Sequence, residues 1–165
     1  MGKSKSSKSS KAMEVDVTPT PVPTQAKRTY VSPIAHPLSS DSLAKDLLGV
    51  AKKATPHKHV VRGVRDVVRA IRKGSKGLAV LAADSYPVDT ISHVPVLCED
   101  NQIPYVFVPS KRDLGVMTLT KRPTTCVLIV PGGKTGKDKQ GLSDYQTNYD
   151  QCFQSVKSLN DSIAL

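Results

Sequence analysis

Apolar residues recur along the chain in two patterns. In some segments they return every three or four positions, which is the spacing of one helix face, and in others they form short unbroken runs, which suit strands covered on both sides. The two patterns alternate from residue 39 onward. The expected helices cover residues 40–51, 63–73, 87–98, 110–115 and 142–159, and the expected strands cover residues 59–61, 78–83, 103–108 and 126–130.

Residues with strong positional preferences mark several of these ends. Ser40 or Asp41 suits the N-cap of the first helix, because a short polar side chain there accepts a hydrogen bond from a first-turn N–H. Gly74 ends the second helix, and Pro87 fits the first turn of the third, where no N–H is needed. Helices that alternate with buried strands pack on both sides of a sheet. The pattern therefore predicts an α/β fold, a three-layer α/β/α sandwich.

The two ends of the chain differ from this middle part. Residues 1–38 begin with GKSKSSKSSK and carry five prolines between positions 18 and 37, with almost no periodic apolar pattern. We expect a disordered, basic and proline-rich tail there, because such a segment buries too little surface to offset its chain entropy. The lysine–serine run suits a nuclear import signal, a nonspecific RNA-binding arm or a solvated tail without a specific role.

Residues 39–131 form the predicted domain. Residues 132–165 are expected to add a basic loop and a C-terminal amphipathic helix that packs on the domain. The apolar side of this helix carries Leu142, Tyr145, Tyr149, Phe153, Val156 and Leu159.

Length and composition restrict the class of protein. A chain of 165 residues suits one domain. No run approaches the roughly 18 apolar residues of a membrane span, and the first thirty residues lack the apolar segment of a signal peptide, so we expect a soluble protein without a membrane partner. Three cysteines, at spacings that fit neither a disulfide framework nor paired zinc ligands, favour buried thiols in a reducing compartment.

Positive charge is concentrated in one part of the chain. The formal net charge is +10, and residues 45–76 hold ten lysines and arginines against two acids. A surplus of this size attracts polyanions over a long range. Nucleic acid is therefore the first partner to consider.

Helical spacing gives the segment 63–73 one apolar and one basic face. Valine and isoleucine gather on the first face, and only Asp66 interrupts the second. Arginine binds phosphate through two parallel hydrogen bonds and stacks on bases, so this pattern favours contact with RNA or DNA over a solvated charged face. The basic face carries Arg62, Arg65, Arg69, Arg72 and Lys76.

Candidate catalytic and metal-binding residues lack the spacing that their chemistry needs. In PGGKTGK, a phosphate-binding loop needs glycine where the chain has Pro131 and serine or threonine where it has Asp138. His57 and His59 have no Cys or acidic ligand nearby, and His93 falls among apolar positions, where we expect a core or boundary histidine. No acid–base pair is identifiable. We expect no enzymatic activity, metal, cofactor or small-molecule substrate.

Four successive blocks of sequence carry a family resemblance. They are RGVRDVVRAIRKG, GLAVLAAD, YPVDTISHVPVLCEDNQIPYVFVPSKRDLG and KRPTTCVLIV, which span Arg62 to Val130 almost without gaps. These blocks resemble those of the kink-turn-binding ribosomal-protein family, and LCEDNQIPYVFVPSK followed by DLG is the most specific of them. The resemblance implies an α/β/α sandwich with a mixed four-stranded sheet, in agreement with the apolar pattern.

In that family, the RNA-binding helix begins Gly-x-Asn-Glu-x-x-Lys and contacts the sheared G·A pairs and the backbone of a kinked RNA. The matching residues are Gly63, Arg65, Asp66 and Arg69. Gly63 and Arg69 agree with the pattern, and Asp66 keeps the carboxylate on a shorter stem. Arg65 departs from it, because a guanidinium only donates hydrogen bonds and is attracted to any phosphate. We therefore expect relaxed specificity for kinked RNA.

The second RNA-facing element of the family is an apolar loop before the last strand, which wedges against a flipped nucleotide. Leu119 matches this wedge, whereas Lys121 and Arg122 make the loop basic and favour backbone contact. The resemblance and the charge pattern together give one set of candidate RNA-binding residues, namely Arg62, Gly63, Arg65, Asp66, Arg69, Arg72, Lys76, Leu119, Lys121 and Arg122.

Within the family, Arg65 and the segment TKRPT resemble the branch that serves in H/ACA particles. This implies a non-catalytic core subunit of the nucleus and nucleolus that holds H/ACA guide RNA for pseudouridylation of ribosomal RNA and for ribosome biogenesis. Its implied protein partners are a pseudouridine synthase subunit and the small protein bound to it. Three alternatives stay open: a ribosomal or box C/D and spliceosomal protein that recognises kink-turns by itself, a scaffold that binds an acidic protein, and, as the weakest, an RNA-modifying enzyme.

Overall fold

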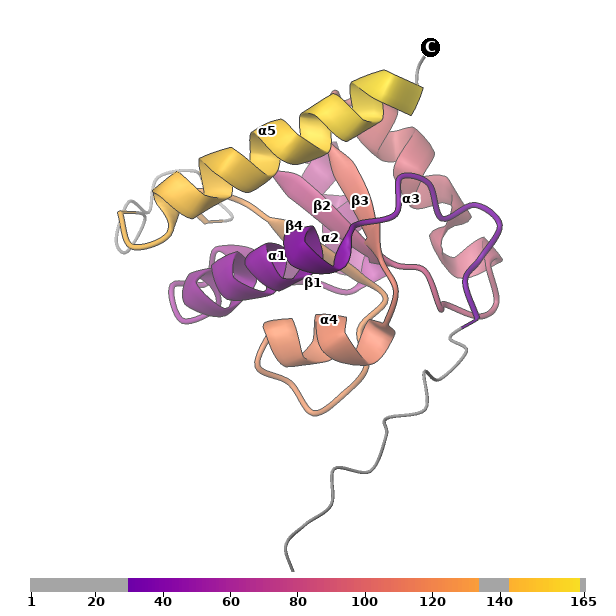
Figure 1. Ribbon diagram of the computed structural model, residues 1–165, viewed down its shortest axis with the longest axis horizontal. Coiled ribbons are helices and arrows are strands. Elements are labelled where there is room, and N and C mark those ends of the chain that lie inside the picture. Colours follow the sequence, from indigo (N-terminus) through magenta and orange to yellow (C-terminus); the bar gives the residue numbers. More distant parts are fainter. Residues whose placement is uncertain (1–29, 134–142, 164–165) are drawn as a thin grey trace, which may run out of the picture.

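Four strands form one sheet, and helices cover it on both sides (Figure 1). The structure, a computed structural model, describes residues 30–133 and 143–163. The strands are β1 (Val60–Arg62), β2 (Leu78–Ala82), β3 (Tyr105–Val108) and β4 (Cys126–Ile129). The helices are α1 (Asp41–Ala54), α2 (Val64–Arg72), α3 (Asp89–Asp100), α4 (Lys111–Met117) and α5 (Gln146–Ile163).

The strand order is β1-β4-β2-β3. β2 pairs in parallel with β3 and antiparallel with β4, and β1 pairs antiparallel with the other side of β4. The register places Val80 between Val106 and Val127. Every residue of β2, β3 and β4 is buried, as unbroken apolar runs predict. The expected mixed four-stranded sheet is confirmed.

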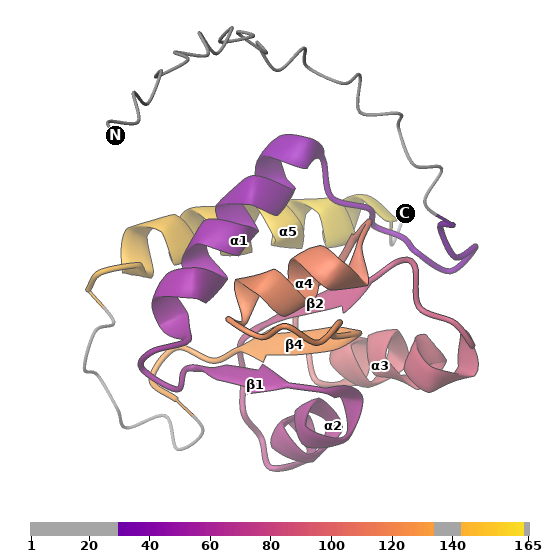
Figure 2. The same cartoon turned by 90° about the horizontal axis from the view of Figure 1, so that it is seen from below.

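Alternate residues of the strands contribute to two separate cores. Leu78 and Val80 pack with α1, α4 and α5, whereas Ala79 and Leu81 pack with α2 and α3. Figure 2 shows the resulting layers, with α1 and α5 on one side of the sheet and α2 and α3 on the other. The expected three-layer α/β/α sandwich is therefore confirmed.

The expected tail needs a correction at residues 30–38, which pack on the domain and end at the outer edge of β3. The Phe107 N–H donates to the Pro37 carbonyl at 2.9 Å, and the Ser39 N–H donates to the Phe107 carbonyl at 2.8 Å. This segment has no apolar period of its own, but its prolines favour extended backbone, and an edge strand offers unpaired N–H and C=O groups. The domain therefore includes residues 30–38, and residues 1–29 lie outside the described part of the chain.

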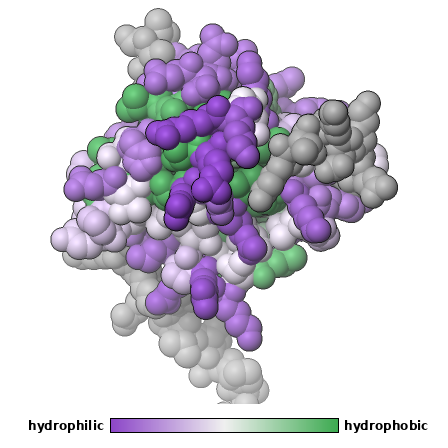
Figure 3. Space-filling view, turned by 180° about the vertical axis from the view of Figure 1, so that it is seen from behind, coloured by the Kyte–Doolittle hydropathy of each residue, from purple (hydrophilic) through white to green (hydrophobic). Residues whose placement is uncertain are grey.

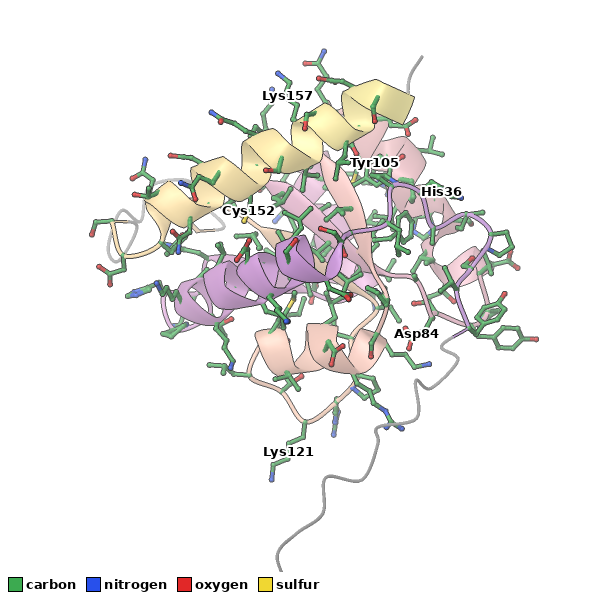
Figure 4. All side chains as sticks on the ribbon, viewed as in Figure 1. His36, Asp84, Tyr105, Lys121, Cys152 and Lys157 are labelled. Carbon is green, nitrogen blue, oxygen red and sulfur yellow. The ribbon has the colours of Figure 1, made fainter. Side chains whose placement is uncertain are left out.

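Helix α5 covers the rest of the same edge. With its nitrogen placed against the Tyr105 carbonyl, the Asn160 carboxamide donates to that carbonyl at 2.9 Å, and its oxygen accepts from the Tyr105 N–H at 3.0 Å. Figure 4 shows Tyr105 beside the C-terminal half of α5. The carbonyls of Pro104 and Val108 accept hydrogen bonds from the N–H groups of Ala79 and Ala83, in and just after β2. The backbone groups of Tyr105 and Phe107, which alternate with them along the strand, therefore point away from β2. Both outward-facing residues of β3 are thus paired.

The start of α3 differs from the expectation. The helix begins at Asp89 with Val88 as its N-cap, so Pro87 lies before the helix and not in its first turn. The reason is a tight turn, in which the Thr90 N–H donates to the Pro87 carbonyl at 3.3 Å. The other marked ends agree with the sequence: Ser40 caps α1, and Gly74, at φ +81°, follows α2.

His59 belongs to the core and does not form the first residue of β1. Its Nδ1 lies 2.5 Å from the Tyr145 hydroxyl, and both side chains are buried. Burial raises the pKa of Tyr145 above its ordinary value, so the hydroxyl stays protonated at neutral pH. Tyr145 therefore joins the turn before α5 to the start of β1. Leu142, expected on the same apolar side, lies outside the described residues.

Candidate nucleic-acid interface

Helix α2 begins directly beside the start of β4. The Gly63 N–H donates to the Cys126 carbonyl at 2.9 Å, and the Gly63 carbonyl accepts the first helical bond from Val67 at 3.0 Å. Gly63 has φ +84°, which a residue with a side chain adopts only with strain. No side chain caps this helix start, so the first-turn N–H groups and their partial positive charge are left for an anion.

The loop between α4 and β4 is held in place by its own hydrogen bonds. The buried Thr118 hydroxyl donates to the Gly115 carbonyl at 3.0 Å, and Thr120 donates to the same carbonyl through its N–H at 3.1 Å. A Cβ at Gly115 would lie 2.4 Å from the Arg122 carbonyl oxygen, so only glycine permits this close return of the chain. The loop is therefore folded tightly over α4.

Leu119 lies at the tip of this loop with its side chain in solvent. It is 61% exposed, and its φ of +54° places it in the left-handed region. An exposed large apolar side chain on a strained backbone is unfavourable by itself, by about 1 kcal/mol or more for the backbone alone. The hydrogen bonds of the loop hold Leu119 in this position.

Arg62 joins the two elements. Its guanidinium Nη1 donates to the Thr118 carbonyl at 3.3 Å, across a sequence distance of 56 residues. The helix start and Leu119 therefore lie on one surface, as the sequence-based set of candidates requires. The structure also gives Arg62 a second role, because its guanidinium holds the loop.

The arginines of α2 are exposed, as helical spacing predicts. Arg65, Arg69 and Arg72 lie on the solvent side together with Asp66, and Val67 and Ile71 are buried in the core below. Val64 and Val68 are only partly buried. The apolar face is thus narrower than expected, and part of it borders the surface.

Those two valines form part of an open groove between α2 and α3. Figure 3, which views this side of the molecule, shows an apolar hollow crossed and bordered by hydrophilic side chains. The groove has a volume of about 520 Å³ and is lined by Val64, Arg65, Val68, Arg69, Arg72, Lys73 and His93.

Lys73 and His93 are therefore members of the basic surface that sequence spacing did not select. Lys73 is the C-cap of α2 and falls off the helical face. His93 is exposed on α3, whereas its apolar neighbours in the sequence predicted a core or boundary position. Only the packing of α3 on α2 brings it to the groove, so no local signal reveals it.

The remaining candidates lie at opposite ends of this surface. Lys121 and Arg122 are exposed on the Leu119 loop, and Figure 4 shows Lys121 pointing away from the domain. Lys76 is exposed beyond the C-terminal end of α2, next to Gly77, which packs against Ile129 at the end of β4. Since β4 spans about 10 Å at 3.3 Å per residue, the structure does not bring Lys76 to the Leu119 loop.

Among residues 30–133 and 143–163, no three His, Cys, Asp or Glu side chains gather closely enough to hold a metal ion. No helix in these ranges is long and apolar enough to cross a membrane. Most of the PGGKTGK segment, residues 134–137, lies outside the described residues.

Comparisons with known proteins show what the whole chain is similar to. The model of the ribosomal protein L7Ae/L30e/S12e/Gadd45 family matches residues 45–137. The chain is 52% identical over 106 residues to the H/ACA ribonucleoprotein complex subunit nhp2 of Schizosaccharomyces pombe, with 64% of this chain and 68% of the relative covered. It is 43% identical over 131 residues to the H/ACA ribonucleoprotein complex subunit 2-like protein of Xenopus laevis, with 79% and 81% covered.

A solved structure extends the comparison to three dimensions. The Giardia lamblia 15.5kD RNA binding protein superposes with a TM-score of 0.60 and is 27% identical in sequence. The match covers 74% of this chain and 99% of that protein. The two therefore share the fold of the domain over nearly the whole length of the smaller protein.

Proposed function

The chain belongs to the ribosomal protein L7Ae/L30e/S12e/Gadd45 family, and from that membership we propose that it is an RNA-binding core subunit of the H/ACA small nucleolar ribonucleoprotein. The observation that carries this proposal is the similarity to relatives named as H/ACA subunits, which extends over about four fifths of the chain. The solvent-facing arginines of α2 supply a physical means of holding RNA.

The geometry suggests how an RNA is held. Phosphates bind the first-turn N–H groups of α2 and the guanidiniums of Arg65 and Arg69, while Leu119 packs against an unstacked base or ribose. Arg62 fixes the distance between these two contacts through its bond to the loop carbonyl. Lys121 and Arg122 add backbone contacts beside Leu119.

In this role the chain supplies binding and not chemistry. It holds the H/ACA guide RNA while a pseudouridine synthase subunit modifies ribosomal RNA, and it docks near that enzyme through the enzyme's small partner protein. We propose that the chain holds guide RNA in the nucleus and nucleolus, as part of ribosome biogenesis. A subunit fixed by neighbours in a particle needs little RNA selectivity of its own, because tethering raises the effective concentration of the RNA. This low selectivity agrees with Arg65, because a guanidinium binds any phosphate.

Sequencing of the RNA that copurifies with the full chain tests the proposal. Crosslinking in cells, followed by capture at high salt, should enrich H/ACA guide RNAs over other small RNAs. The double variant Arg65→Glu/Arg69→Glu should lose the enrichment. Enrichment of ribosomal RNA or box C/D RNA in their place would overturn the H/ACA assignment.

A second function remains supported by one observation. Leu119 keeps the apolar wedge at the loop tip, and the solved structure of similar fold is named an RNA binding protein. These features also suit a ribosomal or box C/D and spliceosomal subunit that recognises kink-turns by itself. Binding of the isolated chain to a kink-turn and to a straight stem of equal length separates the two functions, since only the second function needs strong selectivity.

A further inference from the structure

The groove between α2 and α3 extends well beyond the helix start and the Leu119 loop. Arg72 and Lys73 line it at the C-terminal end of α2, and His93 lines it from α3. Its floor consists of Val64 and Val68, which are only partly buried. Among the residues that the structure describes, no acidic side chain lines it. The groove therefore combines an apolar floor with a rim of cations.

This combination selects a ligand that carries both flat apolar surface and regular negative charge. Single-stranded nucleic acid has both features, because its bases expose apolar faces and its phosphates recur along the backbone. Three arginines and a lysine on one groove are well placed for phosphates, and a histidine ring offers a face on which a base can stack.

The groove is also continuous with the surface described above. Arg65 lies in the first turn of α2 and at the same time lines the groove. An RNA chain that leaves the helix start can therefore follow α2 along Arg65, Arg69 and Arg72, with Asp66 as the acid on this helix. Continuity favours RNA as the occupant over an acidic segment of a protein.

We propose that the α2–α3 groove binds a single-stranded RNA segment that flanks the RNA held at the start of α2, with Lys73 and His93 as further RNA-binding residues. This inference rests on the proposed RNA-binding function, which it deepens by adding a second contact. Arg72 and Lys73 bind phosphates of the flanking segment, and one of its bases lies on Val68 beside the His93 ring.

The first experiment compares RNAs of two lengths with the full chain. The short RNA is a kinked stem, and two longer RNAs each add ten single-stranded nucleotides to one end of it. At least one extension should raise affinity about tenfold or more, the size expected of charged hydrogen bonds to phosphate. The variant Arg72→Gln/Lys73→Gln should remove this gain, taken as the ratio of its own affinities for the long and the short RNA, and lower the salt slope for the long RNA by about 1.4 to 1.8.

A matched control is available on the opposite side of the sheet. Lys52 and Lys53 are also adjacent, exposed and cationic, at the last turn of α1. The variant Lys52→Gln/Lys53→Gln removes the same charge and should retain the gain from the extension. Equal losses in the two double variants would overturn the groove, because they would show that net charge alone binds the extension.

Crosslinking locates the RNA directly. The chain has three cysteines, all buried. Burial raises the pKa of Cys98 to about 12 and raises the pKa of Cys126 and Cys152 as well, so these thiols stay protonated and unreactive. His93→Cys therefore creates a single reactive thiol for a photoactivatable crosslinker. Its crosslinks should fall within the added nucleotides.

Gln154→Cys on α5 is the control for crosslinking, because Gln154 is exposed on the other side of the sheet. Crosslinks from His93→Cys no stronger than this background would overturn the groove. An RNA extension that gives no gain in affinity would also overturn it, and so would a gain that survives in Arg72→Gln/Lys73→Gln. Both results are expected if the groove binds an acidic protein instead. If the unaltered chain fails to bind even the short RNA, the proposed function itself fails.

Discussion

Helices α1 and α2 have similar interiors but different starts. Each buries a stripe of apolar residues against the sheet. In α1, the Ser40 hydroxyl accepts from the Leu43 N–H at 3.4 Å, Asp41 lies in the first turn, and Lys52 and Lys53 lie in the last. Each of these features matches the helix dipole. Helix α2 likewise has an acid, Asp66, in its first turn and Arg69 and Arg72 in its last, but no side chain caps its start and Arg65 also lies in the first turn.

The difference shows that the buried face of a helix and its exposed ends have separate functions. The apolar stripe of either helix is sufficient to place it on the sheet. The end groups of α1 are used within the protein and add to its stability. Those of α2, Gly63 and Arg65, leave donors and positive charge free for a ligand. The contrast is open to direct test.

The largest effect is expected from charge reversal on α2. Arg65→Glu/Arg69→Glu removes two phosphate contacts and introduces repulsion, so RNA affinity should fall about a hundredfold or more. Both side chains are exposed, and the fold should survive. Lys45→Glu/Lys53→Glu on α1 makes the same change in charge and should lower affinity less than about threefold. Equilibrium anisotropy at one fixed salt concentration measures both, and equal losses would contradict a role specific to α2.

Arg65→Asn should change selectivity more than affinity. Asparagine donates and accepts hydrogen bonds, so it can pair with a purine edge that a kink presents, whereas arginine binds phosphate on many RNAs. The variant should bind a straight control RNA more weakly and a kink-turn equally or better. A good base contact is worth roughly 1 to 3 kcal/mol in DNA complexes. Selectivity for the kink-turn over the straight RNA should therefore rise about tenfold or more.

Competition between the two RNAs, measured with the unaltered chain and the variant, decides this point. Asp66→Glu can be added to Arg65→Asn, because the longer carboxylate stem reaches further toward a base. Strong kink-turn selectivity in the unaltered chain would contradict this account of Arg65 and favour the box C/D or ribosomal alternative.

Loss of the α1 cap should affect stability and leave RNA binding unchanged. Ser40→Ala removes the hydrogen bond to Leu43 and should lower the free energy of unfolding by about 0.5 to 1 kcal/mol. Urea denaturation measures the change, with Ser158→Ala in the interior of α5 as a control that loses no cap. A loss of RNA affinity in Ser40→Ala would place the start of α1 at the interface and break the contrast with α2.

The smallest effect is expected from deletion of residues 1–29. They carry six lysines and arginines against two acids, so their removal should weaken RNA binding about two- to threefold through the loss of long-range attraction. The thermal midpoint should stay within about 2 °C, whereas deletion through residue 39 should lower it clearly, because that segment pairs with β3. A hundredfold loss of affinity without residues 1–29 would move the main RNA contact away from α2.

Local patterns predicted the elements of the fold well. Ser40 and Gly74 marked helix ends because their effect depends on neighbouring backbone alone, and the apolar runs at residues 78–83 and 126–130 could only suit buried strands. The sequence predicts a tail at residues 30–38, because nothing in an extended proline-containing segment shows that it will pair with a strand edge. Such pairing exists only in the folded chain.

The candidate site was predictable to the extent that it lies on one helix. The exposure of Arg65, Arg69 and Arg72 follows from the period of α2. The bond between Arg62 and the Thr118 carbonyl and the approach of His93 do not follow from it, because each joins elements that only the sheet topology brings together. The strained φ of Leu119 likewise results from hydrogen bonds that close the loop.

The sealed edge of β3 bears on how this chain behaves at high concentration. An open strand edge can recruit a strand from another copy, which is a common route to aggregation and domain swapping. Here the Asn160 carboxamide imitates a peptide group at Tyr105, and residues 37–39 pair with Phe107. The opposite edge, β1, is only three residues long and carries Arg62. Copies crowded on neighbouring RNAs can therefore meet without polymerising through their sheets.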